Sequence, residues 1–448
     1  MITYIARWVL PISAPPIENG AVAVDDGRIQ YVGAASGAPR GDRVDLGDAL
    51  LMPGLVNAHC HLELTAMRGF LEDLDFPQWI LRLNGVKRAV LDRERMLDAA
   101  RLGLVEGIRH GITTYADTCD TGVAFDAMLE AGIRGIMYQE VFGPDPRQCE
   151  ESMAGLRAKV DMLRPRQTAL VRVGVSPHAP YTVSDDLYAA VARYAEDESL
   201  GIAVHIAESE AERELVAAGD GFFARGLRKR GIDIQPRARS SIELLQRTGV
   251  LQRRPLLIHC VRLDATDIAN VASHAAPIAH CPISNAKLGH GTAPLLEFLD
   301  AGVTVALGSD SVASNNRMDM LAEARAAVLA QRARVARHDV LCARDALQVA
   351  TLGGARALGL DAEIGTLEAG KSADLAAFPL AAHVAPVHDA DSTAIFALPG
   401  TAASLVVVAG RELVVEGRLL AEDSALVARV DASARLMAEW ARAQATTR

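Results

Sequence analysis

The segment from Leu50 to Gly69 carries two histidines at a spacing that can bind a metal. An apolar run, Leu51 to Val56, leads into His59 and His61, with Cys60 between them. On a β-strand these two histidines would point to the same face, about 7 Å apart, because successive side chains alternate. Two imidazoles that converge at a strand end can hold one divalent metal ion. The pair alone leaves a second interpretation open, in which both are ordinary polar residues of a loop.

Two later residues have the right types to complete such a site. His205 lies at the end of the apolar run Ile202 to Ile206, and Asp310 follows the run Val303 to Leu307. Three imidazoles and one carboxylate suit Zn²⁺, with Fe²⁺ as the second choice. We therefore expect one divalent metal ion whose ligands are His59, His61, His205 and Asp310.

Two further residues are candidate proton carriers. Glu208 lies three residues after His205, where its carboxylate could take a proton from a metal-activated water and pass it to a leaving group. His259 ends another apolar run and could polarise the substrate or orient the water, and Asp310 could assist proton removal. Structural alternatives exist for each, since Glu208 could begin a helix, Asp310 could cap one, and His259 could be a hydrogen-bonded core residue.

Alternating strands and helices would bring these residues together. Short apolar runs between about residues 51 and 355 alternate with longer helical stretches, which is typical of βα units. Eight such units predict an α/β fold of the (β/α)₈ TIM barrel type, whose active site lies at the C-terminal ends of its strands. Nearly every run ends in a reactive group, as this fold requires. The predicted strands are Gly54–His59, Ile112–Tyr115, Gly135–Gln139, Leu170–Val175, Ile202–Ile206, Leu256–His259, Pro277–Ala279 and Val303–Leu307.

The two ends of the chain resemble each other more than they resemble the middle. The first 50 residues contain a predicted hairpin around Asp25 to Arg28, and Ser404 to Gly417 predicts another with its turn at Ala409 to Arg411. Glu363 to Leu375 also has the texture of a turn-rich hairpin. We therefore expect a small β-sandwich domain formed by both termini, with the barrel inserted in it. The expected limits are 1–52 and 359–425 for the β-sandwich, 53–358 for the barrel and 426–448 for a C-terminal helix.

Composition excludes several classes of function. The 448 residues carry a formal net charge of −10 and only 4% aromatic residues, which argues against nucleic-acid binding. No apolar run reaches the roughly 18 residues of a membrane span, and the first residues lack a signal peptide. The six cysteines are scattered without a CxxC pair, which favours a reduced cytoplasm. We expect a small-molecule substrate as the partner, with neither nucleic acid nor membrane.

Five motifs in order resemble the amidohydrolase superfamily. They are Leu-Met-Pro-Gly-Leu-Val-Asn-Ala-His-Cys-His (51–61), Ser-Pro-His-Ala-Pro-Tyr-Thr (176–182), His-Ile-Ala-Glu (205–208), His-Cys-Pro-Ile-Ser-Asn-Ala-Lys-Leu (280–288) and Leu-Gly-Ser-Asp-Ser-Val-Ala-Ser-Asn-Asn (307–316). The similarity covers nearly the whole chain. It is greatest to the branch of S-adenosylhomocysteine/5′-methylthioadenosine deaminases and triazine chlorohydrolases.

The resemblance implies a role for each matching residue. One metal would be bound by the four ligands named above, Glu208 would shuttle the proton, and His259 would assist at the hydrolytic water. His178 would contact the substrate. Binuclear branches carry a carboxylated lysine at the end of the fourth strand, and this chain has Val-Ser-Pro-His there, which supports one metal. Relatives of this kind are commonly dimers or larger, so we expect a homo-oligomer.

The chain departs from the nucleoside deaminases in one substrate contact. Those enzymes place a ribose-binding glutamate after a tryptophan, and the positions that match here are Trp79 and Arg88. The stretches 61–65 and 138–143 are similar instead to a sub-branch of aminodeoxyfutalosine deaminases. Glu63 and Glu140 in these stretches are then candidate substrate contacts, although a structural role fits each as well.

The leading hypothesis is a metal-dependent hydrolase that deaminates an amino-substituted purine, nucleoside or other N-heterocycle. A chlorohydrolase or amidase that acts on a triazine-like or amide substrate is the alternative. Loss of chloride requires no proton, so a retained Glu208 and Asp310 favour an amine or amide leaving group. A non-catalytic structural relative is the remote alternative.

Overall fold

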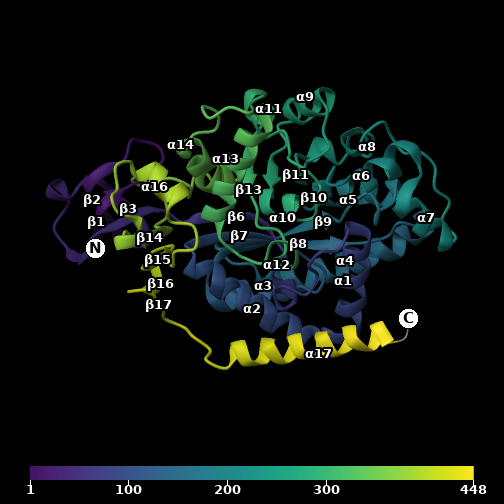
Figure 1. The fold of residues 1–448 in the computed structure, drawn as a ribbon, viewed down its shortest axis with the longest axis horizontal. Helices are drawn as coiled ribbons and strands as arrows, with labels where there is room; N and C mark the ends of the chain where they lie inside the picture. Colours follow the sequence, from purple (N-terminus) through teal and green to yellow (C-terminus); the bar gives the residue numbers. More distant parts are fainter. Residues whose placement is uncertain (447–448) are drawn as a thin grey trace.

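Eight parallel strands form a closed barrel at the centre of the molecule (Figure 1). The computed structural model describes residues 1–446. Two four-stranded parallel sheets, β6 to β9 and β10 to β13, are joined by bridges from Val175 to Ile202 and from Cys60 to Asp310. All eight predicted strands are confirmed within a few residues of the predicted ends. Their bounds are β6 Leu55–Cys60, β7 Ile112–Cys119, β8 Arg134–Val141, β9 Val171–Pro177, β10 Ala203–Ile206, β11 Leu256–His259, β12 Ile278–His280 and β13 Val305–Leu307.

Helices follow each strand and cover the outside of the barrel (Figure 1). Parallel neighbours need such crossovers, and the apolar faces of the helices close the core against the strands. The segments between strands also carry extra short helices, and those after β6 and β10 are the longest. The helices are α1 Phe76–Val90, α2 Arg93–Arg109, α3 Val123–Ala131, α4 Cys149–Leu163, α5 Asp185–Asp197, α6 Glu210–Arg213, α7 Gly221–Lys229, α8 Ser241–Arg247, α9 Ala265–Ser273, α10 Pro282–Lys287, α11 Leu295–Asp300, α12 Val312–Asn315, α13 Met320–Val335, α14 Ala343–Gln348 and α15 Gly354–Ala357.

Both ends of the chain build one additional sheet beside the barrel, at the left of Figure 1. Strand β5 from the first part pairs antiparallel with β14 from the last part, so this β domain is formed by both termini as expected. The predicted hairpins around Gly27 and Gly410 are confirmed. The strands are β1 Ile2–Val9, β2 Ile17–Asp25, β3 Arg28–Ala34, β4 Asp42–Asp45, β5 Ala49–Pro53, β14 Leu375–Pro379, β15 Leu405–Val408, β16 Arg411–Val415 and β17 Arg418–Leu419.

The hairpin predicted over 363–375 is wrong. Residues 363–374 form turns, and only Leu375 begins a strand, whose partners are β5 and β15. The physical reason is a buried ion pair: Asp374 accepts two hydrogen bonds from the guanidinium of Arg134 at the start of β8, at 2.8 and 3.1 Å. This segment is therefore used to join the β domain to the bottom of the barrel. The exact domain limits stay a prediction.

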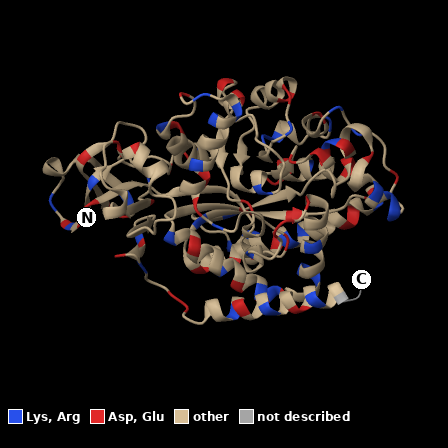
Figure 2. Ribbon diagram, in the orientation of Figure 1, with Lys and Arg blue, Asp and Glu red and all other residues tan. Residues whose placement is uncertain are grey.

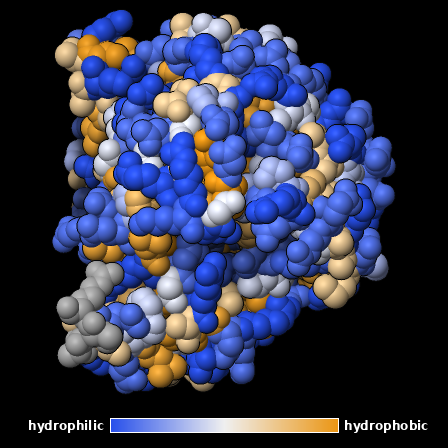
Figure 3. Space-filling model, turned by 90° about the vertical axis from the view of Figure 1, so that its right-hand side faces the viewer, coloured by the Kyte–Doolittle hydropathy of each residue, from blue (hydrophilic) through white to orange (hydrophobic). Residues whose placement is uncertain are grey.

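A long C-terminal helix, α17 Leu426–Thr446, runs along the outside of the barrel against α1 and α2 (Figure 1). The last two residues of the predicted helix 426–448 lie outside the described residues. Figure 2 shows acidic and basic side chains interspersed along α17 and over the rest of the molecule. Figure 3 shows a largely hydrophilic face with small, separated hydrophobic patches. Within residues 1–446, no helix has the length and apolar character that crossing a membrane requires.

Candidate active site

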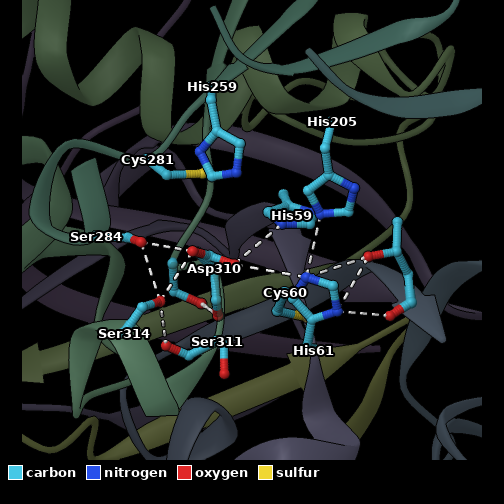
Figure 4. A network of polar contacts seen from close by, with 12 residues as sticks. His59, Cys60, His61, His205, His259, Cys281, Ser284, Asp310, Ser311 and Ser314 are labelled. Atoms are coloured by element: carbon cyan, nitrogen blue, oxygen red, sulfur yellow. Dashed lines mark hydrogen bonds and ion pairs between the residues drawn. The ribbon is translucent and has the colours of Figure 1, made fainter. Parts of the chain in front are cut away.

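Side chains from several strands or strand ends converge above the C-terminal end of the barrel (Figure 4). They face a cavity of about 730 Å³. Residues that line it include most of those predicted from the sequence, namely His61, Trp79, Glu140, His178, His205, Glu208, His259 and Asp310. His59 lies just beneath them, with 1% of its surface exposed.

Three histidines and one aspartate form a tight cluster at the base of the cavity. His59 Nε2 lies 3.3 Å from Asp310 Oδ1, and His61 Nε2 lies 3.5 Å from the same oxygen. His61 Nε2 is also 3.2 Å from His205 Nε2. Nitrogen atoms that face each other at this distance have no favourable direct contact unless one carries a proton, so the cluster fits a cation at its centre.

The protonation state of the cluster also suits a metal. Burial lowers the pKa of His59 to about 4 and the pKa of His205 well below its ordinary value. Burial alone would raise the pKa of Asp310, but the surrounding imidazoles hold it well below its usual range. Neutral imidazole and ionised carboxylate are the forms that bind metals. Neither ring nitrogen of the buried His59 has a well-aligned hydrogen bond, which leaves one free to bind a metal.

Hydrogen bonds behind the cluster orient its members. Thr118 O lies 2.9 Å from His61 Nδ1, and His178 O lies 3.2 Å from His205 Nδ1. Carbonyl oxygens only accept, so both Nδ1 atoms carry the proton and both Nε2 lone pairs point into the cluster. The sequence could indicate the histidines but not these backbone partners.

Asp310 is held by two serines that were not predicted. Ser284 Oγ and Ser314 Oγ both donate to Asp310 Oδ2, at 2.5 and 2.8 Å, so that Oδ1 faces the histidines (Figure 4). The backbone of Asp310 is left-handed, with φ of +56°. Such a conformation costs about 1–3 kcal/mol in a residue other than glycine, and it is typical of functional sites.

Glu208 lies at the side of the cluster between two histidines. Its Oε1 is 3.7 Å from His259 Nε2 and 3.3 Å from His290 Nε2. Burial would raise the pKa of Glu208, but these two imidazoles lower it, so the side chain is a carboxylate near neutral pH. His259 has a left-handed backbone, with φ of +75°, and its Nδ1 contacts Asn285 Oδ1 at 3.0 Å. This leaves Nε2 of His259 directed at Glu208.

A second buried glutamate, Glu212, supports the backbone at Glu208. Its carboxylate accepts hydrogen bonds from Ala207 N at 2.7 Å, Glu208 N at 3.1 Å and Ser241 Oγ at 2.6 Å. Ala207 has a left-handed φ of +52°. Glu212 is fully buried, although its sequence position looks like the exposed first turn of a helix. Sequence reasoning missed both Glu212 and His290, and only the position of His290 between two glycines could have drawn attention to it.

Aromatic side chains form one wall of the cavity. Phe76 stacks on Trp79 with ring centroids 6.1 Å apart, and Tyr181 stacks on Phe223 at 4.2 Å. The edge of Phe76 also meets Tyr181 at 6.4 Å, which joins the two pairs. Such a wall can pack against the face of a planar ring. Trp79 is therefore placed where the sequence predicted it, while the other three aromatics were not predicted.

Another side of the cavity carries charged residues. Glu63 pairs with Lys87 Nζ and accepts a hydrogen bond from Thr121 Oγ1 at 2.5 Å, so its carboxylate is fully engaged by the protein. Glu140 lies beside His178, with Oε1 3.9 Å from His178 Nε2. Arg88, which matches the ribose-binding glutamate of the nucleoside deaminases, lines the mouth of the cavity and is exposed.

Comparisons with known proteins place the chain among enzymes. A model of the amidohydrolase family matches residues 50–413. A 5-methylthioadenosine/S-adenosylhomocysteine deaminase of Moorella thermoacetica is 36% identical over 425 residues, which are 93% of this chain and 94% of that protein.

Two solved structures share the architecture. An adenosine deaminase of Xanthomonas campestris with bound zinc superposes with a TM-score of 0.86 and 29% identity, over 99% of this chain and 98% of that one. An atrazine chlorohydrolase of Arthrobacter aurescens, complexed with zinc, gives a TM-score of 0.82 and 25% identity, over 97% and 100%. These matches confirm the resemblance inferred from the five motifs. With its eight-stranded barrel, its histidine–aspartate cluster and its match over most of its length, the chain belongs to the amidohydrolase family.

Proposed function

We propose that this protein is a zinc-dependent hydrolytic deaminase of adenosine-type nucleosides. The observation that carries the proposal is the position of the Glu208 carboxylate, beside the histidine–aspartate cluster and in the same cavity as the aromatic wall. This arrangement supports a role for Glu208 as a proton carrier, because it shares one cavity with a cluster that can bind a metal and with a surface that suits a planar ring. The names of the relatives, deaminases of adenosine and its derivatives, support the choice of substrate.

One metal ion, Zn²⁺ in our proposal, would be held by His59, His61, His205 and Asp310. Their nitrogen and oxygen donors match the ligand types that zinc prefers. When bound, the ion supplies a water of lowered pKa as the nucleophile. Glu140 and His178 also lie within 4.8 Å of a His205 nitrogen, but His205 uses Nδ1 for the hydrogen bond to His178 O and Nε2 for the first cluster, so it has no nitrogen left for a second ion. The proposal therefore keeps a single ion.

The side chains of the protein would move the protons. Water adds to the carbon that carries the amino group, a C–O bond forms, and the C–N bond then breaks to give ammonia and a carbonyl product. Glu208 takes one proton from the attacking water and gives it to the departing nitrogen. His259 keeps the Glu208 carboxylate ionised and directs Nε2 toward it, 3.7 Å away. Asp310, whose Oδ2 is held by two serines while Oδ1 faces the histidines, can accept the second proton of the water. This proton then goes to the ring nitrogen beside the reacting carbon, so that ammonia and a neutral carbonyl product form.

The substrate ring would lie between the aromatic wall and the charged side. Trp79 and Phe76 would pack against its face, and His178 and Glu140 would contact polar groups elsewhere on the substrate. A ring held in this way presents its amino-bearing edge to Glu208, because both lie in one cavity. We also propose that the protein acts in the cytoplasm as a homo-oligomer, a dimer or larger, which light scattering can test.

Ammonia release tests the proposal directly. Purified protein that contains about one zinc ion per chain should deaminate adenosine and 5′-methylthioadenosine. Glu208→Gln should retain zinc and lose most activity, by about 10²- to 10⁴-fold, as expected for removal of a proton carrier. Glu210→Gln is the matched control, because Glu210 is exposed and its one ion pair among residues 1–446 is with Arg213.

The opposite results are equally clear. Glu208→Gln protein that keeps its metal and the parent rate would exclude the role of Glu208. Zinc-loaded parent protein that releases no ammonia from any nucleoside, but releases chloride from atrazine, would favour the chlorohydrolase alternative.

A further inference from the structure

Glu140 has an unsatisfied carboxylate that faces the substrate cavity. Only 5% of its surface is exposed, yet its Oε1 has no hydrogen-bond partner among the described residues. Two other carboxylates that line the cavity are engaged, since Glu63 binds Lys87 and Thr121, and Asp120 lies 3.3 Å from Lys87 Nζ. A buried carboxylate oxygen without a partner costs about 1–3 kcal/mol or more, so a site that keeps one has a use for it.

His178 is the second half of this subsite, and its ring offers an acceptor. Thr182 Oγ1 donates its single proton to Ala179 O at 3.1 Å, so it can only accept from His178 Nδ1, 2.8 Å away. With the proton on Nδ1, the neutral ring presents a lone pair on Nε2. That atom lies 3.9 Å from Glu140 Oε1, too far for a direct hydrogen bond. Two acceptor atoms therefore face the cavity with space for a substrate group between them.

A hydroxyl group suits this space better than an amino group. A hydroxyl oxygen can sit about 2.8 Å from both atoms. If Glu140 is protonated, as its burial and the neighbouring carboxylates favour, the hydroxyl accepts from Glu140 and donates to His178. If the Lys87 ammonium keeps Glu140 ionised, two neighbouring hydroxyls can donate to one acceptor each. An amino group can only donate and suits only the ionised form.

We propose that Glu140 and His178 form the subsite for the sugar hydroxyls of the nucleoside, which makes Glu140 a specificity-determining residue. This inference rests on the proposed function, because it takes the substrate to be a nucleoside. The position is consistent with that role. Glu140 lies within 4.8 Å of a His205 nitrogen, beside the histidine–aspartate cluster. At the position that matches the ribose-binding glutamate of the nucleoside deaminases, the cavity is lined by Arg88, which cannot accept a hydrogen bond.

The test measures kcat/KM for adenosine, 2′-deoxyadenosine and 3′-deoxyadenosine with the zinc-loaded protein. We expect the parent to favour adenosine by at least tenfold over one of the deoxynucleosides. Glu140→Ala should reduce kcat/KM for adenosine by about 10- to 100-fold, the range for loss of a hydrogen bond to a buried charged or polar group. The same variant should act on that deoxynucleoside nearly as well as the parent does, so that the preference falls to about one.

Asp120→Asn is the matched control. It removes another carboxylate that lines the cavity, but this carboxylate already pairs with Lys87. It should keep the parent's preference for adenosine. Glu140→Gln keeps the side-chain shape and replaces one acceptor oxygen by a donor, so it should lower the preference even where Glu140→Ala fails to fold. The zinc content of each variant shows whether the metal site is occupied, and its thermal unfolding shows whether the protein is folded.

Two results would overturn the inference while leaving the proposed function intact. One is a parent enzyme that deaminates all three nucleosides with equal kcat/KM. The other is a Glu140 variant that lowers kcat/KM for all three by the same factor. A parent that releases ammonia from none of them would instead remove the proposed function, and the inference with it.

Discussion

Glu212→Gln should slow the reaction although Glu212 does not reach the cavity. The carboxylate holds the two backbone N–H groups of Ala207 and Glu208 with separate oxygens. Glutamine has only one acceptor oxygen, so one of these buried donors would lose its partner, at a cost of about 1–3 kcal/mol. The left-handed backbone of Ala207 already costs about 1–2 kcal/mol. We expect the segment to relax and Glu208 to shift.

The kinetic consequence separates positioning from binding. In the proposed mechanism Glu208 carries protons, so a displaced carboxylate should lower kcat by about 10- to 100-fold, part of the contribution of a well-placed proton carrier. KM should change little, since the hydrogen bonds of Glu212 hold the backbone at Ala207 and Glu208 and the Ser241 hydroxyl, and none of them goes to the aromatic wall. Steady-state ammonia release with protein of verified zinc content measures both. Glu210→Gln, on the exposed side of the same helical turn, should leave kcat unchanged.

Stability supplies a second readout, because burial raises the pKa of Glu212 from 4.5 to about 7. Between these pH values the folded protein binds this proton more tightly than the unfolded chain does. The contribution of Glu212 to stability is therefore full below pH 4.5 and is lost as the pH rises through 7. The shift corresponds to about 3 kcal/mol. The free energy of unfolding of the parent, minus that of Glu212→Gln, should fall over this range. An unchanged kcat together with a pH-independent difference would refute the reasoning.

Three further predictions concern the metal and the core. Ser284→Ala removes a hydrogen bond to Asp310 Oδ2 and should weaken zinc binding by about 10- to 100-fold, as measured by competition with a chelator. An unchanged zinc affinity would show that Ser314 alone is sufficient to orient Asp310. Removal of zinc by chelation should abolish ammonia release and lower the unfolding temperature, and added Zn²⁺ should restore both; activity that survives chelation would contradict the metal assignment. Asp374→Asn breaks the buried ion pair with Arg134 and should lower the free energy of unfolding, measured with denaturant, by about 3–5 kcal/mol, with kcat per folded molecule unchanged. A decrease of less than about 1 kcal/mol would mean that water replaces the ion pair.

The sequence predicts the barrel well because its signal is local. Each strand is a short apolar run that ends in a polar residue, as at His205 and His259, and parallel strands bring their C-terminal ends to one edge. Order along the chain then suffices to collect the histidine–aspartate cluster. The segment around Asp374 shows the limit of this reasoning. Its turn residues suggested a hairpin, and its actual role depends on Arg134, 240 positions away in the sequence.

Residues that support the site are hidden for the same reason. Ser284, Ser314 and Glu212 have ordinary helical or capping positions in the sequence, and only the folded chain directs them at Asp310 and Glu208. The two glutamates that follow β10, the fifth strand of the barrel, show the contrast. Glu208 lies three residues after His205, so the sequence indicates it as a candidate proton carrier. Glu212 accepts three buried hydrogen bonds, but in the sequence it looks like any acidic residue in the first turn of a helix. Burial decides between them, and burial depends on the segment around Ser241 that closes over the turn. Activity at this site should therefore respond to changes well outside the cavity.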